Sequence, residues 1–461
     1  MSKKLKPCLL IMATIAITAC SLNPEYARPT APIPKSYPVV DEAGTANAPN
    51  SWQQYFTEPE LQRVIEIALQ NNRDYRITAL RIEEARAQYG IQRSNRLPTV
   101  NGTLSYERSQ TIMAQGQTFE ADMYRVGLGI SDFELDFFGR VKSLSTAALE
   151  EYFATEEAKQ TARTSLIAEV AVAYLNVRTL SERQAIAQDT LASREVSKER
   201  IQRRYNAGID AAVDLKTAEL QLDSARASLA ALKREQLQAV NSLILLVGDQ
   251  SLRITAAEPL DKLKFAALPI GLPSQLIERR PDIRAAEHKL IAANANIGAA
   301  RAAFFPRVQL TTNVGMVNDS FTKLFTAGSS HAWAFTPQLT LPIFNHGRNQ
   351  ANLDLASVRK NISVAEYEKT IQTAFSEVSD VLLARAQLEE QLIAQNRVTA
   401  AEQERLRLAT RRYDMGVSNY LELLDAQRSL FDSQQALVQL KQRSLSNSII
   451  LFKVLGGEWK A

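Results

Sequence analysis

Two stretches of the chain repeat apolar residues at helical spacing and contain no helix breaker. Residues 140–207 and 348–415 each run for 68 residues without glycine or proline, enough for a helix of about 100 Å at 1.5 Å per residue. After Gly208 and Gly416 come second breaker-free runs, which end at Val247 and Leu455. In the second runs leucine and alanine recur at heptad spacing, which is typical of coiled coils: Leu215, Ala218, Leu222, Ala225, Leu229, Leu232, Ala239, Leu243 and Leu246 in the first, and Leu423, Leu430, Leu437 and Leu451 in the second. The pattern predicts two antiparallel helical hairpins.

Shorter stretches alternate apolar and polar residues with a period of two, which predicts β-strands. The apolar positions are Tyr124, Val126, Leu128 and Ile130 in one stretch and Val308, Leu310, Val314 and Met316 in another. Segments 99–109 and 331–343 are similar, so we expect two β-hairpins, with polar loops at 110–121 and 318–330.

A helix is expected before each β-hairpin. The first begins at an N-cap on Thr57, where Glu60 completes a capping box, and runs to about Arg96. The second begins near Gly271, is interrupted at Pro281 and continues to about Phe304.

The order of elements is the same in both halves of the chain, and one offset relates them. Adding 208 to a residue number carries Asp74 onto Asp282, Arg93 onto Arg301, Gly139 onto Gly347, Tyr205 onto Tyr413, Gly208 onto Gly416 and Gly248 onto Gly456. No gap is needed, and the period is far longer than that of a solenoid unit. We therefore expect a tandem duplication, with repeat 1 over residues 58–248 (β-hairpin at about 98–138) and repeat 2 over 272–456 (β-hairpin at about 306–346).

The start of the chain carries an export signal. Three lysines precede an apolar run at residues 8–19, which is typical of a signal peptide over residues 1–19 and too short to span a bilayer as a helix. The peptide ends in Ile17-Thr18-Ala19-Cys20, which resembles a bacterial lipobox, so Cys20 is predicted to be lipidated. The alternative is a spare thiol beside a plain cleavage site. Ser21 at the next position favours sorting to the outer membrane, and the proline-rich segment 20–57 is expected to run extended.

The predicted strands are too few to close a membrane barrel, for which eight is the usual minimum. Open strand edges are not tolerated in lipid, so strands in a membrane would require several chains: two copies supply eight strands and three supply twelve. The alternative is a soluble four-stranded sheet. Phenylalanines near the strand ends fit an interfacial girdle, although packing at strand ends explains them equally well: Phe133, Phe137, Phe138, Phe304, Phe305 and Phe344.

Together these features resemble the TolC-like outer-membrane factors, lipoprotein branch of tripartite multidrug efflux pumps. The resemblance is carried by the decapeptide Glu278-Arg279-Arg280-Pro281-Asp282-Ile283-Arg284-Ala285-Ala286-Glu287, the Arg-Tyr-x-x-Gly turns at 204–208 and 412–416, and Leu424-Asp425-Ala426-Gln427-Arg428-Ser429-Leu430. It covers about residues 20–460. It implies a mainly helical fold with a small β part: a homotrimer whose 12-stranded outer-membrane β-barrel, four strands per chain, continues into a long periplasmic α-helical barrel. An equatorial belt would use the linker 249–271 and the termini, including the tail 457–461.

The resemblance also implies a function. The protein would be the passive exit duct for drugs or other small molecules, which an inner-membrane efflux transporter expels through a periplasmic adaptor protein. The hairpin tips, with Tyr205 and Gly208 in the first and Tyr413 and Gly416 in the second, would dock the adaptor. The alternative is that these glycines only end the helices.

A periplasmic gate is implied by motif match at Leu421 and Asp425, which would form an apolar ring and an acidic ring in the pore. Their counterparts in the first half are Val213 and Thr217. Three Asp425 carboxylates around one axis would repel one another and favour cations. The alternative is an ordinary buried leucine and an exposed aspartate on a coiled coil.

Composition adds little reactive chemistry to this picture. The chain has 54 basic and 50 acidic residues, a net charge of +4, too even for a nucleic-acid-binding protein. Loss of the three lysines of the signal peptide lowers it to +1. His288, His331 and His346 show no ligand spacing, so we expect no metal site, no catalytic residue and no cofactor besides the lipid on Cys20. A structural or adhesive coiled-coil lipoprotein and an exit duct for secreted proteins stay open as alternative functions.

Overall fold

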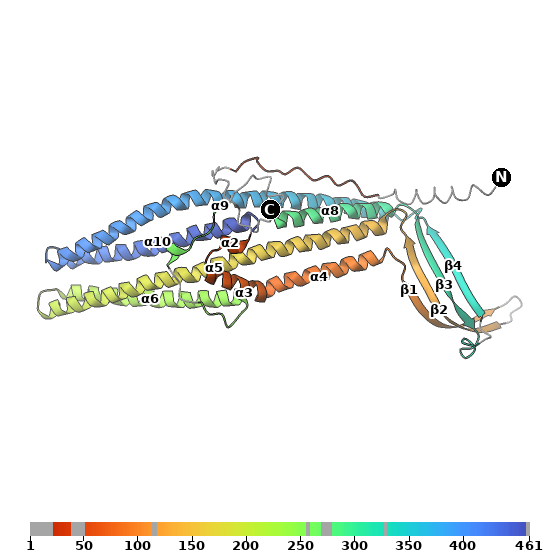
Figure 1. Cartoon of the computed structure of the whole chain (residues 1–461), viewed down its shortest axis with the longest axis horizontal. Coiled ribbons are helices and arrows are strands. Elements are labelled where there is room, and N and C mark those ends of the chain that lie inside the picture. The colour runs from red at the N-terminus through yellow and green to blue at the C-terminus, as the bar shows by residue number, and fades with distance from the viewer. Residues whose placement is uncertain are drawn as a thin grey trace. The chain divides into compact units, whose positions relative to one another are not determined.

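The computed structural model describes residues 22–37, 51–112, 118–254, 259–268, 279–326 and 330–457 (Figure 1). They belong to two compact units. Unit 1 combines residues 1–31, 80–156 and 285–369, and unit 2 combines 32–79, 157–284 and 370–461. Both halves of the chain therefore contribute to each unit. None of the helices within the described residues is long and apolar enough to cross a membrane.

Unit 1 contains one antiparallel sheet with the strand order β1-β2-β3-β4. The strands are β1 (Val100–Ile112), β2 (Thr118–Leu135), β3 (Arg307–Asn318) and β4 (Ser330–Thr340). Both predicted β-hairpins are present, but β1 and β2 extend through residues that the sequence pattern assigned to a loop. Side chains brace this extension: Arg108 Nη2 lies 2.7 Å from Glu120 Oε2, and the Tyr106 hydroxyl donates to Asp122 Oδ1 at 2.7 Å.

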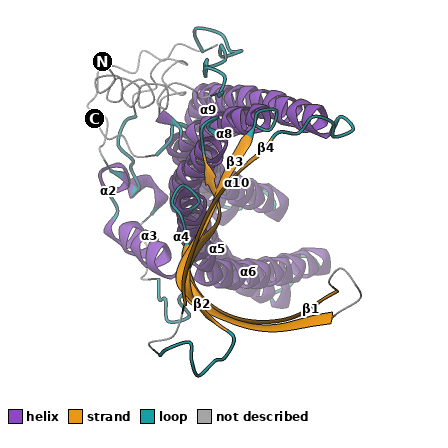
Figure 2. Cartoon of the chain, turned by 90° about the vertical axis from the view of Figure 1, so that its right-hand side faces the viewer, coloured by secondary structure: helices purple, strands orange, loops and turns teal. Residues whose placement is uncertain are grey.

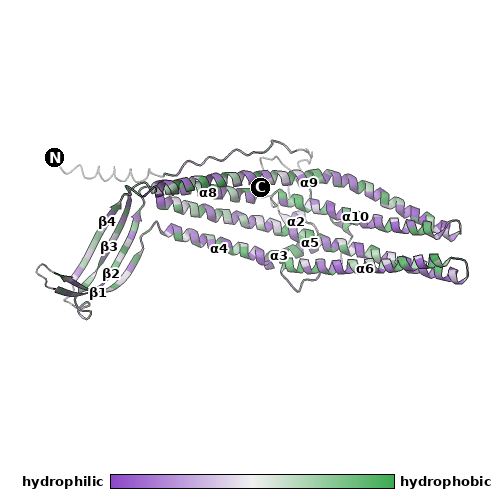
Figure 3. Cartoon of the chain, turned by 180° about the vertical axis from the view of Figure 1, so that it is seen from behind, coloured by the Kyte–Doolittle hydropathy of each residue, from purple (hydrophilic) through white to green (hydrophobic). Residues whose placement is uncertain are grey.

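The sheet is curved (Figure 2). The strand register separates its side chains into an apolar face and a polar face. The apolar face carries Val100, Leu104, Val126, Leu128, Val314, Met316, Trp333, Phe335 and Leu339, most of them exposed in the single chain. Next to the β1–β2 turn the same face carries the paired charges of Arg108, Glu120 and Asp122. The polar face carries Asn101, Thr103, Ser105, Arg125, Gly127, Asn313, Gly315, Ala334 and Thr336. The alternation of hydrophobic and hydrophilic residues along the strands is visible in Figure 3.

Strands β2 and β3 approach each other closely at a pair of glycines. Gly127 lies opposite Gly315, and a Cβ atom at Gly315 would stand 2.1 Å from the Val126 carbonyl oxygen. Glycine is therefore required here by the backbone of the neighbouring strand. Further along, a bulge between Ile130 and Phe133 shifts the register.

Helix α8 (Pro281–Ala302) packs in unit 1 against the first part of α5 (Arg140–Asn206). The contact is made by small residues, since Ala147, Ala292 and Ala295 form a buried cluster. Where these helices meet the strands, the rings of Phe138 and Phe305 stack with centroids 4.8 Å apart. These two phenylalanines thus pack against each other, as the strand-end interpretation predicts.

Unit 2 contains the turns and the greater part of the two predicted helical hairpins, whose first helices begin in unit 1. The first joins α5 to α6 (Ala212–Val247), and the second joins α9 (Arg348–Asp414) to α10 (Tyr420–Val454). α5 and α9 are each 67 residues long, which confirms the prediction from the breaker-free runs. The heptad leucines of α6 are buried: Leu215, Leu222, Leu229 and Leu243. Leu180, Leu229 and Leu232, with Phe431 packed against them, join α5, α6 and α10.

The helix expected from Thr57 to about Arg96 is in fact two helices, α3 (Pro59–Asn71) and α4 (Arg73–Ser94). Asn72 separates them: its Oδ1 accepts from the Tyr75 N–H at 2.7 Å, and its Nδ2 donates to the Leu246 carbonyl at 2.7 Å. The capping box is also wrong. The Thr57 hydroxyl donates to the Lys264 carbonyl at 2.9 Å, and Glu58 occupies the N-cap without a side-chain bond.

An aromatic cluster gathers three distant parts of the chain in unit 2. Phe56, which follows α2 (Trp52–Tyr55), forms a β-bridge with Phe265, just beyond the short helix η1 (Leu260–Lys262). The Tyr55 ring stacks on Phe265 and Phe452 with centroids 5.5 and 5.0 Å away. The segment before α3, the linker after α6 and the end of α10 therefore share one core.

Candidate functional site

The turn between α5 and α6 is built around Gly208, whose φ of +71° is left-handed and suits glycine, which has no Cβ to clash. The Gly208 N–H donates to the Tyr205 carbonyl and the Ile209 N–H to the Arg204 carbonyl, both at 2.9 Å. The Arg204 side chain then pairs with Asp210, with Nε 2.9 Å from Oδ2. These bonds satisfy the last carbonyls of α5 and fix a tight tip.

The turn between α9 and α10 repeats this geometry in the second half of the chain. Gly416 has a φ of +72°, its N–H donates to the Tyr413 carbonyl at 3.0 Å, and the Val417 N–H donates to the Arg412 carbonyl at 2.9 Å. Asn419 then caps α10 by accepting from the Glu422 N–H at 3.1 Å. The two tips are therefore built alike.

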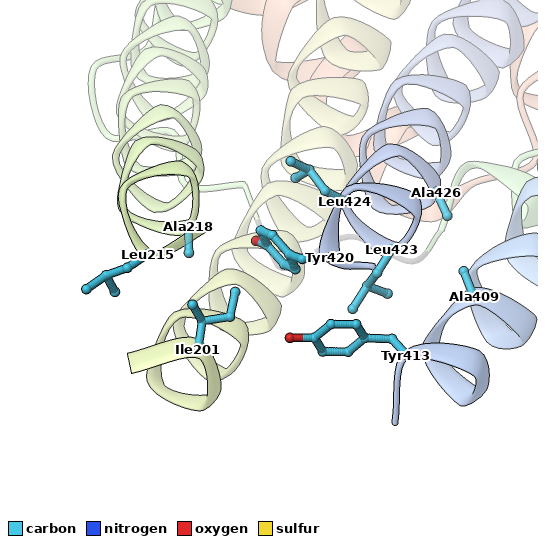
Figure 4. Packing of buried hydrophobic residues seen from close by; sticks show 9 residues of the cluster. All are labelled: Ile201, Leu215, Ala218, Ala409, Tyr413, Tyr420, Leu423, Leu424 and Ala426. Carbon is cyan, nitrogen blue, oxygen red and sulfur yellow. The ribbon is translucent and has the colours of Figure 1, made fainter. Parts of the chain in front are cut away.

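A buried cluster from all four long helices lies directly behind the tips (Figure 4): Ile201, Leu215, Ala218, Ala409, Tyr413, Tyr420, Leu423, Leu424 and Ala426. Tyr413 is only 6% exposed, and burial raises the pKa of its hydroxyl. The ring supports the tip from inside, and a docking role for Tyr413 stays a prediction. Its counterpart Tyr205 is 40% exposed.

Exposed apolar side chains surround both glycine turns. We call the tip patch the five residues Ile209, Val213, Met415, Val417 and Leu421, which are 64–69% exposed. Sequence reasoning did not single out Ile209, Met415 or Val417. The signal in the sequence was the apolar residue directly after each glycine, Ile209 after Gly208 and Val417 after Gly416, because turn residues are usually polar.

The predicted gate residues lie on successive turns of α10. Leu421 is 66% exposed, and the Asp425 carboxylate forms an ion pair with Arg405 of α9. Arg405 also reaches Glu402 at 3.2 Å, and the hydrogen bond to Asp425 raises the pKa of the Arg405 guanidinium. The charge of Asp425 is thus compensated within its own chain. Sequence reasoning missed Arg405, because its partner stands on another helix and no local pattern links the two positions.

The equivalent place in the first half has no such ion pair. Val213 and Thr217 replace Leu421 and Asp425, and the Thr217 hydroxyl donates to the Val213 carbonyl at 2.8 Å. Ser197 stands where the second half has Arg405. The halves share a backbone plan but differ in charge at this level.

Two arginines of α5 tie it to α10 through neutral amides. Arg183 Nε donates to Gln435 Oε1 at 2.7 Å, and Arg194 Nη1 donates to Gln427 Oε1 at 2.5 Å. Arg194 is only 4% exposed, and burial lowers the pKa of its guanidinium. The hydrogen bonds fix how the two helices are aligned along their length.

The remaining predicted site residue, Cys20, lies outside the described residues. Across the described ranges, no group of three or more His, Cys, Asp or Glu side chains could hold a metal ion. His288 instead lies beside Glu150, with Nδ1 2.7 Å from Oε2. The distinctive chemistry of the described chain is therefore apolar tips, a compensated acidic residue near them and a sheet with one apolar face.

Comparison with known proteins identifies this arrangement. The family described as outer membrane efflux protein matches residues 64–249 and 272–457. The starts of the two ranges differ by 272 − 64 = 208 and their ends by 457 − 249 = 208. The duplication and its offset are thereby confirmed.

Individual relatives cover nearly the whole chain. Toluene efflux pump outer membrane protein TtgC of Pseudomonas putida is 43% identical over 464 residues, which cover 97% of this chain and 96% of the relative. Outer membrane protein OprJ of Pseudomonas aeruginosa is 44% identical over 456 residues, covering 97% and 95%. The open state of the MtrE outer membrane channel of Neisseria gonorrhoeae matches with a TM-score of 0.86 at 39% identity, covering 95% and 98%.

These comparisons confirm the resemblance to the TolC-like outer-membrane factors and the mainly helical fold with a small sheet. They also place the protein in the outer membrane, with a helical extension into the periplasm. The chain belongs to the outer membrane efflux protein family and serves as the passive exit duct of an efflux system, not as an enzyme.

Proposed function

We propose that three copies of the chain join their sheets into one 12-stranded barrel, the outer-membrane section of the duct. The observation that carries this proposal is the described sheet, which ends at β1 and β4 and has one exposed apolar face. Backbone groups left unpaired in lipid cost several kcal/mol each, so both edges need a strand from a neighbouring chain. Two copies would meet the eight-strand minimum; the TolC-like family membership supports three.

The polar face of the sheet would then line the lumen. Glycine, serine, threonine and asparagine predominate on it, and its charged side chains are paired. Arg125 Nη1 lies 2.7 Å from Glu107 Oε2, and Glu134 is shared by Arg140 and Arg307. A wetted wall of this kind suits the passage of dissolved small molecules without binding them strongly.

The cargo we propose is small organic molecules, including drugs. Support comes from the relative described as part of a toluene efflux pump. An inner-membrane transporter would supply the energy, and a periplasmic adaptor protein would connect it to this chain. The acylated Cys20 would anchor each subunit, because two or more acyl chains hold a protein in a membrane stably where one does not.

Adaptor docking is proposed at the hairpin tips. The tip patch offers apolar side chains on both hairpins, beside the αL glycines Gly208 and Gly416. Small residues there let a partner helix end approach the backbone closely. Tyr205 is exposed enough to contribute, whereas Tyr413 holds the tip in shape from behind.

The gate is proposed at Leu421 and Asp425 of each chain. Leu421 would present an apolar side chain to the pore, and the Arg405–Asp425 ion pair would hold the start of α10 against α9. Since about half of each side chain is exposed, 46% for Arg405 and 59% for Asp425, the pair itself is weak. A modest force from a docked adaptor could therefore separate the helices and widen the entrance.

Single-channel conductance in planar bilayers tests the gate, using purified full-length protein. Leu421→Ala combined with Asp425→Asn should raise conductance severalfold over the unaltered protein, because the apolar constriction is removed and the ion pair that holds α10 against α9 is lost. Asp432→Asn is the matched control, since it removes an exposed carboxylate from the same helix and should leave conductance unchanged.

The two parts of the proposal fail in different ways. Equal conductance in all three proteins would contradict the gate but leave the duct standing. No current from any of them, despite a heat-resistant oligomer on a gel, would contradict the duct.

A further inference from the structure

The two faces of the sheet exchange their character near the β1–β2 turn. As far as Tyr106 on β1 and Tyr124 on β2, one face carries apolar and aromatic side chains. Beyond these tyrosines that face carries charged residues, and the opposite face, polar until then, carries Phe119, Ala121 and Met123. Side chains alternate between the faces of a strand, and β1 pairs with β2 without a shift in register. We therefore expect different surroundings beyond the tyrosines.

A row of aromatic rings marks the level of this exchange. Tyr106 and Tyr124 stack with ring centroids 4.8 Å apart. Phe321, in the loop after β3, lies edge-on to Tyr124 with centroids 5.9 Å apart, and Phe325 continues the row at 5.9 Å from Phe321. Aromatic residues gather where a membrane meets water. In the barrel proposed above, the row lies at the outer boundary of the bilayer, because the strands lead there away from the periplasmic helices.

Beyond the row the sheet narrows to two strands. Tyr124, opposite Asn318, is the last described residue of β2 that pairs with β3, and residues 118–123 pair with β1. We call residues 107–112 and 118–123 the hairpin extension. A two-stranded hairpin by itself is marginally stable in water. The hairpin extension therefore needs contacts on one of its faces.

The charged face of the hairpin extension is satisfied within the chain. Arg108 Nη2 lies 2.7 Å from Glu120 Oε2, and Arg108 Nε lies 3.9 Å from Asp122 Oδ1. Ile112 is the one apolar residue on this face of the hairpin extension. Paired charges of this kind are stable in water and costly in lipid. The face that lacks a cover is the opposite one, where the Phe119 side chain is 54% exposed.

We propose that the hairpin extensions of three copies meet at the outer mouth of the duct through Phe119 and Met123, and form an apolar constriction there. The inference rests on the proposed 12-stranded barrel, whose lumen is lined by the face that carries these two residues. Three copies around one axis turn the same apolar side chains toward one another, whereas lipid would meet the charged face. Removal of apolar surface from water favours the contact.

The constriction acts on flow through the duct. An apolar ring excludes water and dissolved ions from a pore by dewetting. The rest of the lumen-lining face is polar, and its charged residues Glu107 and Arg125 are paired just below Met123. Outward-moving organic molecules can part three flexible hairpin ends from within. Solutes outside meet a closed apolar ring, so the mouth opposes the return of expelled cargo.

Contact between the copies is tested by cross-linking the purified full-length oligomer with a short bis-maleimide. Phe119→Cys should link pairs of chains, with a yield that does not fall on dilution, because the linked chains belong to one oligomer. Thr118→Cys, the neighbouring position on the opposite face, is the matched control and should link at least tenfold less. The unaltered protein gives the background from other thiols. Equal yields from the two variants would overturn the contact.

The constriction is tested by single-channel conductance in the Leu421→Ala, Asp425→Asn protein, so that the inner end of the duct does not limit the current. Adding Phe119→Ser and Met123→Ser should raise conductance severalfold, because hydroxyl groups replace the apolar ring. Ile112→Ser is the matched control, since it replaces an exposed apolar residue on the opposite face, and it should leave conductance unchanged. Equal conductance with and without the two serines would overturn the constriction.

The outcomes separate this inference from the proposed function. Normal current without a Phe119→Cys cross-link counts against the contact at the mouth and leaves the duct standing. No current from the unaltered protein, despite a heat-resistant oligomer, contradicts the duct itself. Because the two serines could destabilise the hairpin extension, the single exchange Phe119→Cys keeps the test valid, with the heat-resistant oligomer as the measure of assembly.

Discussion

Glycine at position 315 acts through the strand beside it. The backbone of β2 lies so close that a methyl group at Gly315 would overlap the Val126 carbonyl oxygen, 2.1 Å away. In the sequence this glycine only marked a polar position in an alternating strand. The need for it comes from a strand in the other half of the chain, which no local pattern reveals.

Gly315→Ala should weaken barrel assembly through this contact. Forcing an extra carbon into a filled space costs about 1–3 kcal/mol, so the yield of heat-resistant oligomer should fall and its melting temperature on a gel should drop. Gly90→Ala is the control: nothing stands within 4 Å of its Cβ position on α4, and alanine there favours a helix by up to about 1 kcal/mol. An equally stable oligomer in both variants would show that β2 and β3 can separate without loss.

At the scale of elements, the long helices and their turns could be predicted because their signals are local. A glycine that follows a long breaker-free run, as Gly208 and Gly416 do, ends the helix. The heptad leucines mark the buried side of α6. The division of the first helix at Asn72 could not be predicted. Its cause is a hydrogen bond from Asn72 to the Leu246 carbonyl, far along the chain. Around Asn72 itself, from Glu60 to Tyr89, the sequence has neither glycine nor proline. The Arg405–Asp425 pair could not be predicted for the same reason, because its two partners stand on different helices.

The contact between α5 and α10 is predicted to depend on Gln427. Gln427→Leu removes an acceptor from the buried guanidinium of Arg194 and should cost about 1.5–3 kcal/mol, the range for hydrogen bonds to charged groups. Adding Arg194→Leu should recover part of this loss, because no buried charge is left unpaired. Denaturant unfolding followed by helical circular dichroism measures both, with exposed Gln403→Leu as the control. A double variant less stable than Gln427→Leu alone would contradict the explanation.

At the scale of the whole molecule, the number of chains per barrel is the expectation most open to direct test. Coexpressed tagged and untagged chains should form heat-resistant oligomers that separate into four bands on a gel, one for each number of tags from none to three. A barrel of two chains would give three bands. The sequence alone allowed either answer, because four alternating strands fix the need for closure and not the number of copies.

The segment of residues 22–28, whose Tyr26 and Arg28 bind Glu287 of α8, has a consequence for the order of events during synthesis. Its residues are among the first to leave the ribosome, yet Tyr26 and its partner Glu287 are 261 positions apart. The surface that this segment contacts does not exist until α8 has been made and has packed on α5. Closing so large a loop is entropically costly, which makes seating a late step. The amino-terminal part of the chain therefore stays free through most of biogenesis, and residues 22–28 become immobilised only once the rest of unit 1 has folded.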